Sequence, residues 1–245
     1  MARKCLAATT DGFYRDAENW QPISDLVFSF WLWRDDNTQN NICFELVSNV
    51  GSTDGFDYVP NAFLPGDLIR SYYTSGASWS DKWNPPQGTG SWHHYFLVIP
   101  GTGEGVPPPI RNQIWLDGVQ QTLTVNGAAN GAGTYTTNGP FSIMFRRNTN
   151  GGTGQGRALS GRIAEFCVWS SDYMTRNPGL FATQLARGAN PMRVRRTEAV
   201  RYLPFFGADS PEPDYHGGQN AYTVSGSPTL IANPPTMRSF VNWQD

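Results

Sequence analysis

Residues Trp92-His-His-Tyr-Phe-Leu-Val-Ile99 form a run of aromatic and branched side chains that ends at Pro100-Gly101. A second run, Gln113-Ile-Trp-Leu116, leads directly into Asp117-Gly118. Short runs of this composition, bounded by Gly and Pro, are typical of β-strands. An Asp-Gly pair is favoured where a hairpin turn needs positive φ angles. The segment therefore predicts a strand followed by a tight hairpin, whose return strand covers 119–125.

Further strand-like runs lie on both sides of this segment, at Leu26–Trp33, Asn41–Val47, Asp67–Tyr73, Phe141–Phe145, Gly161–Trp169, Val200–Phe206 and Tyr222–Val224. The first two are separated by the polar segment 34–40, and we expect them to pair as a hairpin. Pro204 removes a donor from the sheet ladder, so the run that contains it is expected at a sheet edge.

One helix is predicted, from Pro178 to Arg187. Asn177 before it can cap the first turn, Pro suits the first helical position, and Gly188 after it ends the helix. Three apolar side chains lie close enough on one helix face to dock on a sheet: Leu180, Phe181 and Leu185.

The composition favours one all-β domain with no nucleic-acid partner. The 26 Gly and 18 Pro in 245 residues separate short β-prone runs throughout the chain, and no linker or repeat divides it. We therefore expect a single domain over 1–245, with its core at about 20–235. Only 16% of the residues are charged and the net charge is −2, so there is no basic stripe to neutralise phosphates.

The cysteines and the N-terminus bear on the cellular compartment. Cys5, Cys43 and Cys167 are widely spaced, so we expect no disulfides, and we expect Cys43 and Cys167 to be buried because they lie in apolar runs. The first residues lack the apolar stretch of a signal peptide, and no apolar run approaches the ~18 residues of a membrane span. We expect a chain made in a cytoplasm without a signal peptide and without membrane insertion.

Several motifs, in this order, resemble the LamG-like branch of the concanavalin A-like lectin and glucanase superfamily. They are the strand that begins Trp92-His-His, the hairpin Trp115-Leu-Asp-Gly-Val119, the late strand Gly161-Arg-Ile-Ala-Glu-Phe-Cys-Val-Trp169, the helix end Gly188-Ala-Asn-Pro191 and the closing strand Tyr202-Leu-Pro-Phe-Phe206. The resemblance covers most of the chain. It implies an all-β fold, a two-sheet antiparallel jelly-roll sandwich with one short helix. It does not fix the function, because the superfamily includes lectins, adhesion modules and glucanases.

Catalytic motifs are the first test of function. Glucanases of this superfamily carry Glu-x-Asp-x-Glu on one strand, which places the acid and the nucleophile about 5 Å apart. The nearest string, Glu212-Pro-Asp214-Tyr-His216, ends in His, and Glu165-Phe-Cys-Val-Trp169 has one carboxylate. Nucleophile-elbow, phosphate-loop and zinc-helix motifs are also absent from the sequence. We expect a protein that is not an enzyme and needs no cofactor.

Two places in the sequence carry residue types that can bind a metal. His93 and His94 are neighbours on a strand, so they point to opposite faces and cannot share a metal; one is expected in the core and the other at the surface. The polar segment 35–41 offers oxygen ligands for Ca²⁺, with Asp35 and Asp36 as candidates. A solvated hairpin tip is the favoured alternative, because turns ordinarily contain such polar residues.

Two segments are candidates for binding. Trp79-Ser-Asp-Lys-Trp83 has almost no β periodicity, and we expect a loop whose tryptophans meet a ligand such as a sugar ring, or else tuck beneath the loop. The arginines after the helix, Arg193, Arg195 and Arg196 within a string that includes Arg187 and Arg201, are candidates for docking a partner or else form a solvated polar edge. The tryptophans in strong strands are expected to be mostly core: Trp31, Trp33, Trp92, Trp115 and Trp169.

Three functions remain. The first is a non-enzymatic virion protein of a tailed bacteriophage, either a capsid decoration protein or a tail appendage, because a stand-alone domain without signal, anchor or catalytic set fits a protein released by lysis. Its partners would be a capsid shell and host-surface glycans, and it would be a homo-oligomer or part of a larger assembly. The second is a carbohydrate-binding lectin module of a secreted protein. The third is a glycoside hydrolase with an unrecognised site.

Overall fold

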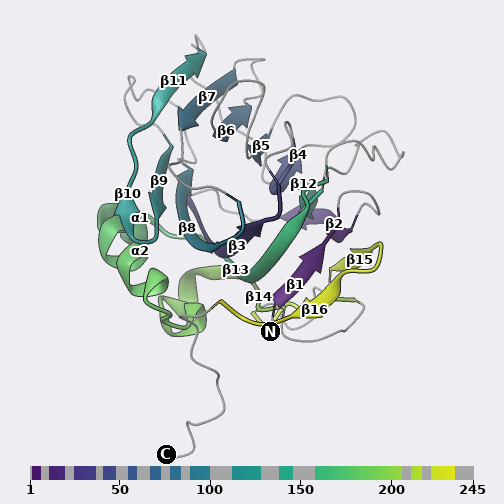
Figure 1. The fold of residues 1–245 in the computed structure, drawn as a ribbon. Helices are drawn as coiled ribbons and strands as arrows, with labels where there is room; N and C mark the ends of the chain where they lie inside the picture. The colour runs from purple at the N-terminus through teal and green to yellow at the C-terminus, as the bar shows by residue number, and fades with distance from the viewer. Residues whose placement is uncertain are drawn as a thin grey trace, which may run out of the picture.

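The computed structural model describes residues 2–6, 11–19, 25–36, 41–47, 55–59, 67–72, 78–83, 89–99, 112–127, 138–145, 158–205, 211–216 and 222–234. Within these ranges the chain forms two antiparallel β-sheets of eight strands each, with short helices beside the first sheet (Figure 1). The prediction of an all-β, two-sheet antiparallel sandwich is therefore confirmed.

The first sheet has the strand order β10-β9-β8-β3-β13-β1-β16, and β14 pairs with the same edge of β13 as β1 does, opposite to β3. Its strands are β1 (Ala2–Cys5), β3 (Leu26–Arg34), β8 (Trp92–Ile99), β9 (Gln113–Leu116), β10 (Val119–Gln120), β13 (Gly161–Ser170), β14 (Ala199–Leu203) and β16 (Thr229–Ile231). Strand β14 ends immediately before Pro204 and pairs with β13 alone, as expected for a strand next to proline.

The second sheet has the order β11-β7-β6-β5-β4-β12-β2-β15. Its strands are β2 (Gly12–Asn19), β4 (Phe44–Val47), β5 (Gly55–Val59), β6 (Asp67–Tyr72), β7 (Ser78–Trp83), β11 (Thr124–Gly127), β12 (Asn138–Ile143) and β15 (Thr223–Ser225). The chain passes between the two sheets repeatedly, for example between β1 and β2 and between β10 and β11.

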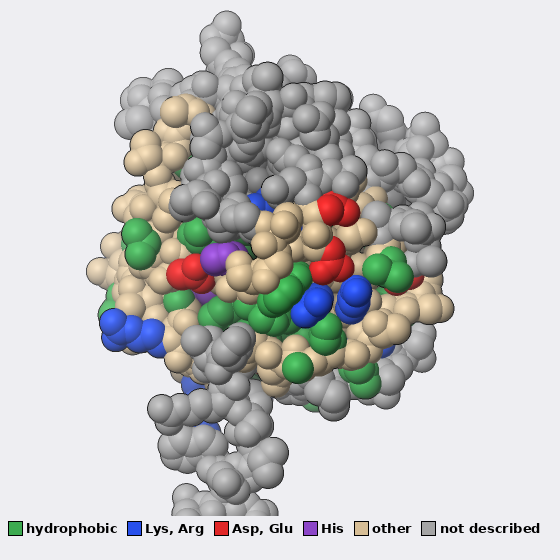
Figure 2. Space-filling model, viewed as in Figure 1, with side chains coloured by type: hydrophobic (Ala, Val, Ile, Leu, Met, Phe, Trp, Pro, Cys, Tyr) green, Lys and Arg blue, Asp and Glu red, His purple; other side chains and the backbone are tan. Residues whose placement is uncertain are grey.

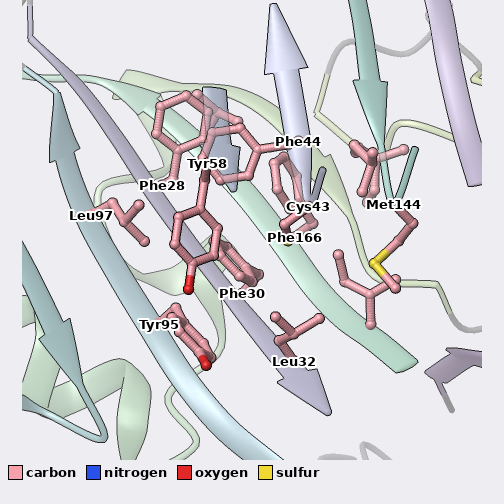
Figure 3. Packing of buried hydrophobic residues seen from close by; sticks show 14 of the residues in the cluster. Phe28, Phe30, Leu32, Cys43, Phe44, Tyr58, Tyr95, Leu97, Met144 and Phe166 are labelled. Atoms are coloured by element: carbon pink, nitrogen blue, oxygen red, sulfur yellow. The ribbon is translucent and has the colours of Figure 1, made fainter. Parts of the chain in front are cut away.

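Aromatic side chains from the facing sides of both sheets form the core (Figure 3). Phe28 on β3 stacks on Phe44 on β4, with ring centroids 4.7 Å apart and planes 14° apart. Phe30 stacks in the same way on Tyr95 of the neighbouring strand β8, with centroids 5.3 Å apart. Stacked and edge-on aromatic pairs contribute about 0.5–1.5 kcal/mol each beyond the area they bury.

The expected hairpin between 26–33 and 41–47 is wrong, because these segments lie in opposite sheets. Strand β3 pairs with β8 over eight residue pairs and with β13 on its other side. Strand β4 has only four residues and pairs with β5 and β12. The longer strands offer β3 a longer ladder of hydrogen bonds, so β4 contributes to the core from across the sandwich instead.

The hairpin between β9 and β10 is confirmed. Val119 pairs with Leu116 and Gln120 pairs with Trp115. Both turn residues have positive φ, 51° at Asp117 and 81° at Gly118. Two positive φ angles give the turn the twist that matches the flanking strands, which is why Asp-Gly occurs there.

The helical region contains more than the one helix predicted. Helix α1 (Asp172–Arg176) precedes helix α2 (Pro178–Ala186), and the 3₁₀ turns η2 (Pro191–Arg193) and η3 (Arg196–Glu198) follow. Asn177 occupies the N-cap position of α2 but its side chain makes no capping bond. Phe181 and Leu185 are buried as expected, whereas Leu180 is 56% exposed, so its expected docking on the sheet is wrong.

The N-terminal segment belongs to the fold, although the core was expected to begin near residue 20. Strand β1 pairs with β13 and β16, and β2 pairs with β12 and β15. Cys5 and Phe13 are fully buried in the main core. All three cysteines are free, as predicted; Cys43 and Cys167 are buried as expected, and Cys5 is buried as well. No helix in the described ranges is both long enough and apolar enough to cross a membrane.

Candidate functional site

The candidate site is a row of side chains on the outer face of the first sheet. Phe28, Phe30 and Leu32 point into the core, so alternation places Trp31 and Trp33 on the opposite face of β3. The strand register then aligns Trp92 with Trp33, Trp33 with Arg162, and Arg162 with Lys4. We call these four residues, from β8, β3, β13 and β1, the outer row.

The side chains of the outer row contact one another. The rings of Trp33 and Trp92 are 6.1 Å apart and meet edge to face at 72°. The Arg162 guanidinium lies over the Trp33 ring, with Cζ 4.1 Å from the ring centroid. Both tryptophans remain partly exposed. The row therefore offers aromatic surface and a cation side by side.

Asp35, just after β3, faces both cations of the row. One of its carboxylate oxygens is 3.8 Å from Nζ of Lys4, and the other is 3.8 Å from Nε of Arg162. Both distances exceed the 2.7–3.2 Å of a direct N–H···O hydrogen bond. The carboxylate thus balances part of the charge without using the donors of either cation.

Arg162 keeps its donors unused. Within the described part of the chain, its guanidinium makes no hydrogen bond; its Nε is shielded from solvent, and the Asp35 oxygen near it is 3.8 Å away. A guanidinium has five N–H donors in a planar fork that matches a carboxylate or a pair of hydroxyl oxygens. Stacking on Trp33 fixes the plane of this fork in advance, which lowers the entropy lost when a ligand binds.

Next to the outer row, on the same face of the sheet, lies a second row of uncharged side chains. Trp31 pairs with His94, whose ring lies 5.2 Å from its own, and it packs with Ala2 and Ala164. Nε2 of His94 is 2.8 Å from Oγ of Ser29. Burial lowers the pKa of His94 to about 3, so the imidazole is neutral at physiological pH. The prediction that one of the two adjacent histidines lies in the core is confirmed, and His93 is partly exposed.

The helices cover the other end of the same sheet face. Phe181 and Leu185 of α2 pack in a cluster with Phe96, Trp115 and Trp169 on the sheet. Figure 2 shows the open end: a histidine beside an acidic side chain, then hydrophobic side chains, then basic side chains follow one another over the region where β8, β3, β13 and β1 lie in Figure 1. The outer row is therefore accessible where the helices end.

The structure places the predicted tryptophan pair differently. Trp79 and Trp83 lie in strand β7, where they pair with Ser71 and Asp67 of β6, so the expected loop is wrong. The contacts of their side chains lie outside the described features. Ladder hydrogen bonds with β6 and β11 hold the segment extended, although its side chains show no alternation of polar and apolar residues.

The predicted docking arginines are exposed but not equivalent. Arg193 ends η2 and Arg196 begins η3. Arg195 stacks over Tyr173 at 4.1 Å and forms an ion pair with Glu198. Arg201, from the same basic string, is buried and ion-paired with Glu18 and Asp214, so it is a core group rather than part of a surface.

The calcium candidates lie at the end of β3. Asp35 is exposed and has a cation beside each carboxylate oxygen, as described above, which opposes the binding of a second positive charge there. Asp36 is partly buried, and residues 37–40 lie outside the described ranges. Within those ranges no group of three or more His, Cys, Asp or Glu side chains is placed to hold a metal ion.

The carboxylates considered for glycoside hydrolysis are buried. Glu212 is ion-paired with Arg3 at 3.1 Å. Glu165 has a positive φ of 51° at a bulge in β13, and its side chain accepts a hydrogen bond from the hydroxyl of Tyr202. Burial raises the pKa of Glu165 to about 7. Both carboxylates have partners inside the protein, and neither belongs to the outer row.

The sequence predicted strand tryptophans mostly as core and so missed the outer row. Trp31, Trp115 and Trp169 are indeed buried, whereas Trp33 and Trp92 are only partly so. Their partners Arg162 and Lys4 lie far apart in the sequence, and only the register of the sheet aligns them. A signal was present in Trp31-x-Trp33, because residues two apart on a strand share a face.

Comparisons with known proteins bear on the fold. No protein-family model and no curated protein matches the sequence. Among solved structures, a candidate carbohydrate-binding protein from Bacteroides ovatus superposes with a TM-score of 0.55 and 15% identity, over 91% of this chain and 60% of that one. The heptameric SAP-like pentraxin from Limulus polyphemus superposes with a TM-score of 0.50 and 12% identity, over 89% of this chain and 96% of that one. The chain has a concanavalin A-like jelly-roll fold, similar to that of the pentraxin.

Proposed function

We propose that the chain is a carbohydrate-binding protein and that the outer row is its binding surface. The observation that carries the proposal is the alignment of Trp92, Trp33, Arg162 and Lys4 across four neighbouring strands. A sugar presents an apolar face of C–H groups and a rim of hydroxyls. Aromatic faces beside charged donors and an acceptor match both features.

The row offers each kind of contact that a sugar ring needs. The partly exposed indoles of Trp33 and Trp92 supply apolar surface. Arg162 and Lys4 supply donors, and Asp35 supplies an acceptor at the same place. Because the strands are rigid and Arg162 is stacked before binding, little side-chain entropy is lost on association. A sugar that carries a carboxylate uses the guanidinium fork best.

The nature of the structural neighbours supports this proposal over the other functions. The Bacteroides ovatus protein is described as a candidate carbohydrate-binding protein. This likeness concerns only the fold. The case for sugar binding comes from the residues of the outer row. Of the three functions that the sequence leaves open, carbohydrate binding is therefore the one that we propose.

A glycan array probed with the purified chain tests this proposal. We expect binding to a set of glycans, with a dissociation constant in the micromolar to millimolar range that suits one shallow surface. The variant Trp92→Ala is expected to lose that binding, because it removes half of the aromatic surface. Binding that Trp92→Ala leaves intact would place the sugar elsewhere.

The virion role, with a capsid shell and host glycans as partners, stays a prediction from the sequence. Imaging of the chain in its native assembly tests it, since density on a shell or tail would support it and a free chain would contradict it. It is compatible with sugar binding, because a surface protein of a particle can bind glycans. The proposal made here depends only on the outer row.

A further inference from the structure

Three side chains at the start of β8 and in the β9–β10 turn form one hydrogen-bonded chain. Oγ of Ser91 is 2.8 Å from Nε2 of His93. Nδ1 of His93 is 2.7 Å from Oδ2 of Asp117. Ser91 directly precedes β8, and Asp117 lies in the turn between β9 and β10. The order of atoms, hydroxyl to Nε2 and Nδ1 to carboxylate, is that of a nucleophile, a general base and the group that orients the base.

Backbone hydrogen bonds hold the carboxylate in place. The other oxygen of Asp117 accepts the backbone N–H of His94 at 2.8 Å, and the backbone N–H of Asp117 donates to the carbonyl of His94 at 2.9 Å. These two bonds tie the turn to the start of β8. The distance between His93 and Asp117 is therefore set by the sheet rather than by two free side chains.

The protonation of the chain follows from its acceptors. Burial acts to raise the pKa of Asp117, but hydrogen bonds from His93 and from the backbone of His94 outweigh it and hold the pKa below its ordinary value. Asp117 is thus a carboxylate, which can only accept a hydrogen bond. Nδ1 of His93 must carry the proton that it donates, and in the tautomer with the proton on Nδ1 alone Nε2 accepts the hydroxyl proton of Ser91. This is the tautomer that a general base needs.

A substrate can reach the serine. Ser91 and Gly90 are exposed, and a Cβ added at Gly90 would meet no atom within 4 Å. Along the chain, Trp92 separates Ser91 from His93 and is also the first residue of the outer row. Because residues alternate across a strand, Ser91 and His93 lie on the face of β8 opposite Trp92, next to the end of the surface proposed to bind sugar.

We propose that Ser91, His93 and Asp117 form a hydrolytic site for carboxylate esters, with O-acylated sugars as the substrate class. The choice of sugar esters rests on the proposed function, whereas the reactivity of Ser91 does not. The activity would contradict the expectation from the sequence that the chain is not an enzyme.

The reaction has two balanced steps. Oγ of Ser91 bonds to the acyl carbon while its proton passes to Nε2 of His93; the bond from the acyl carbon to the sugar oxygen breaks, and that oxygen takes the proton from His93. Water then attacks the acyl-serine and gives a proton to His93, the bond to Oγ breaks, and Ser91 regains its proton. One ester and one water give one alcohol and one carboxylic acid. Asp117 stabilises the imidazolium in both steps and is a positioning residue.

The site is exposed, and water weakens electrostatic stabilisation of the transition state. We therefore expect slow turnover, and a covalent probe is the sensitive measurement. Wild-type protein is treated with a fluorophosphonate, and the adduct is located by mass spectrometry. Release of acetate from p-nitrophenyl acetate and from an O-acetylated oligosaccharide is measured in parallel.

Ser91→Ala is expected to abolish the labelling, and His93→Ala to slow it by at least about 10-fold, the low end for loss of a general base. Asp117→Asn is expected to slow it similarly, because an amide N–H donated to Nδ1 moves the imidazole proton to Nε2. Nitrogen NMR of His93 reports this change of tautomer, which a merely structural role of Asp117 would not produce. The control Ser227→Ala alters another exposed serine and should label as wild type does.

The two proposals can fail separately. If wild type is labelled at Ser91 but binds no glycan, the hydrolytic site stands and the proposed function is wrong. If it binds glycans through the outer row while Ser91 is neither labelled nor needed for ester hydrolysis, the hydrolytic site is wrong. Labelling that Ser227→Ala reduces as much as Ser91→Ala does would also overturn it.

Discussion

The guanidinium of Arg162 lies over the indole of Trp33, with its Cζ atom 4.1 Å from the ring centroid. The two residues face each other on β13 and β3, and Trp92 continues the same line on β8. Shielding N–H donors from water without hydrogen-bond acceptors costs free energy, and a ligand with oxygen acceptors would supply the missing hydrogen bonds. This pair is the centre of the proposed binding surface.

Replacing Arg162 should affect binding far more than stability. Arg162→Gln is expected to weaken glycan binding by about 10-fold, or ~1.4 kcal/mol, because it removes a charged donor fork. The melting temperature should change little, since a partly exposed stacking contact contributes about 0.5–1 kcal/mol. Titration calorimetry and thermal unfolding check both values. The matched control Arg196→Gln removes another exposed arginine outside the row and should bind as wild type does; equal losses in both variants would point to a general charge effect.

Two leucines on one helix should differ sharply in their effect on stability. Leu185 of α2 is 2% exposed in the cluster beneath the helix, whereas Leu180 lies on the outer side. Leu185→Ala is expected to lower the free energy of unfolding by about 2–5 kcal/mol. Leu180→Ala should change it by no more than about 0.5 kcal/mol. Denaturant unfolding measures both, and similar losses would show that α2 is rotated relative to this structure.

Glu165 should make the stability depend on pH. Burial raises the pKa of Glu165 from its ordinary value of 4.5 to about 7, so the folded state holds a proton that the unfolded state has already released. The stabilisation by this proton is complete below pH 4.5 and is lost as pH rises to about 7. Glu165→Gln removes the titration and should flatten the decline.

The expected difference between wild type and Glu165→Gln grows by roughly 3 kcal/mol across that pH range, at about 1.4 kcal/mol for each pKa unit. Urea unfolding at several pH values between 4 and 8 measures it. The conservative change keeps a group that can bond to Tyr202. A constant difference at all pH values would show that Glu165 does not titrate in this range.

A buried ion pair links the N-terminal strand β2 to the late strand β14. Arg201 pairs with Glu18, whose side chain is fully buried. Arg201→Met leaves that carboxylate without its main partner and should cost about 3–5 kcal/mol of stability. Adding Glu18→Gln should restore part of the loss, because the unpaired charge is gone. Equal stability of the single and double variants would show that the charge on Glu18 carries no penalty.

Much of the fold could be predicted from local sequence. The Asp117-Gly118 turn and the strand before it were predictable because a two-residue turn with positive φ has few solutions. The edge position of β14 followed from Pro204 in the same way. Both features depend on residues that are close in sequence.

The pairing of distant strands could not be predicted in this way. Leu26–Arg34 and Phe44–Val47 are both strands, but whether neighbours form a hairpin or cross the sandwich depends on which partner offers the longer ladder. Strands β1 and β2 were missed because Ala2–Cys5 is short and Gly12–Asn19 carries three charged residues, which hides its pairing with β12.

The candidate site could not be predicted for the same reason, because its residues are brought together by the pairing of strands that are distant in sequence. Trp79 and Trp83 stood out because they are close in sequence, yet they lie within a strand of the second sheet. Trp33 and Arg162 are far apart in sequence, and no local pattern marks them as neighbours. Likewise, Ser91, His93 and Asp117 match no nucleophile motif, since the turn of a hairpin brings the carboxylate to the histidine.

The central claim, that sugar binds at the outer row, is tested most directly by one titration series with the best glycan from an array. Calorimetry compares wild type, Trp92→Ala, and the double variant Trp79→Ala with Trp83→Ala, all shown to be folded by circular dichroism. We predict that Trp92→Ala weakens binding by at least about 10-fold and that the double variant binds as wild type does. Retained affinity in Trp92→Ala, with affinity lost in the double variant, would contradict the outer row and place the sugar at β7.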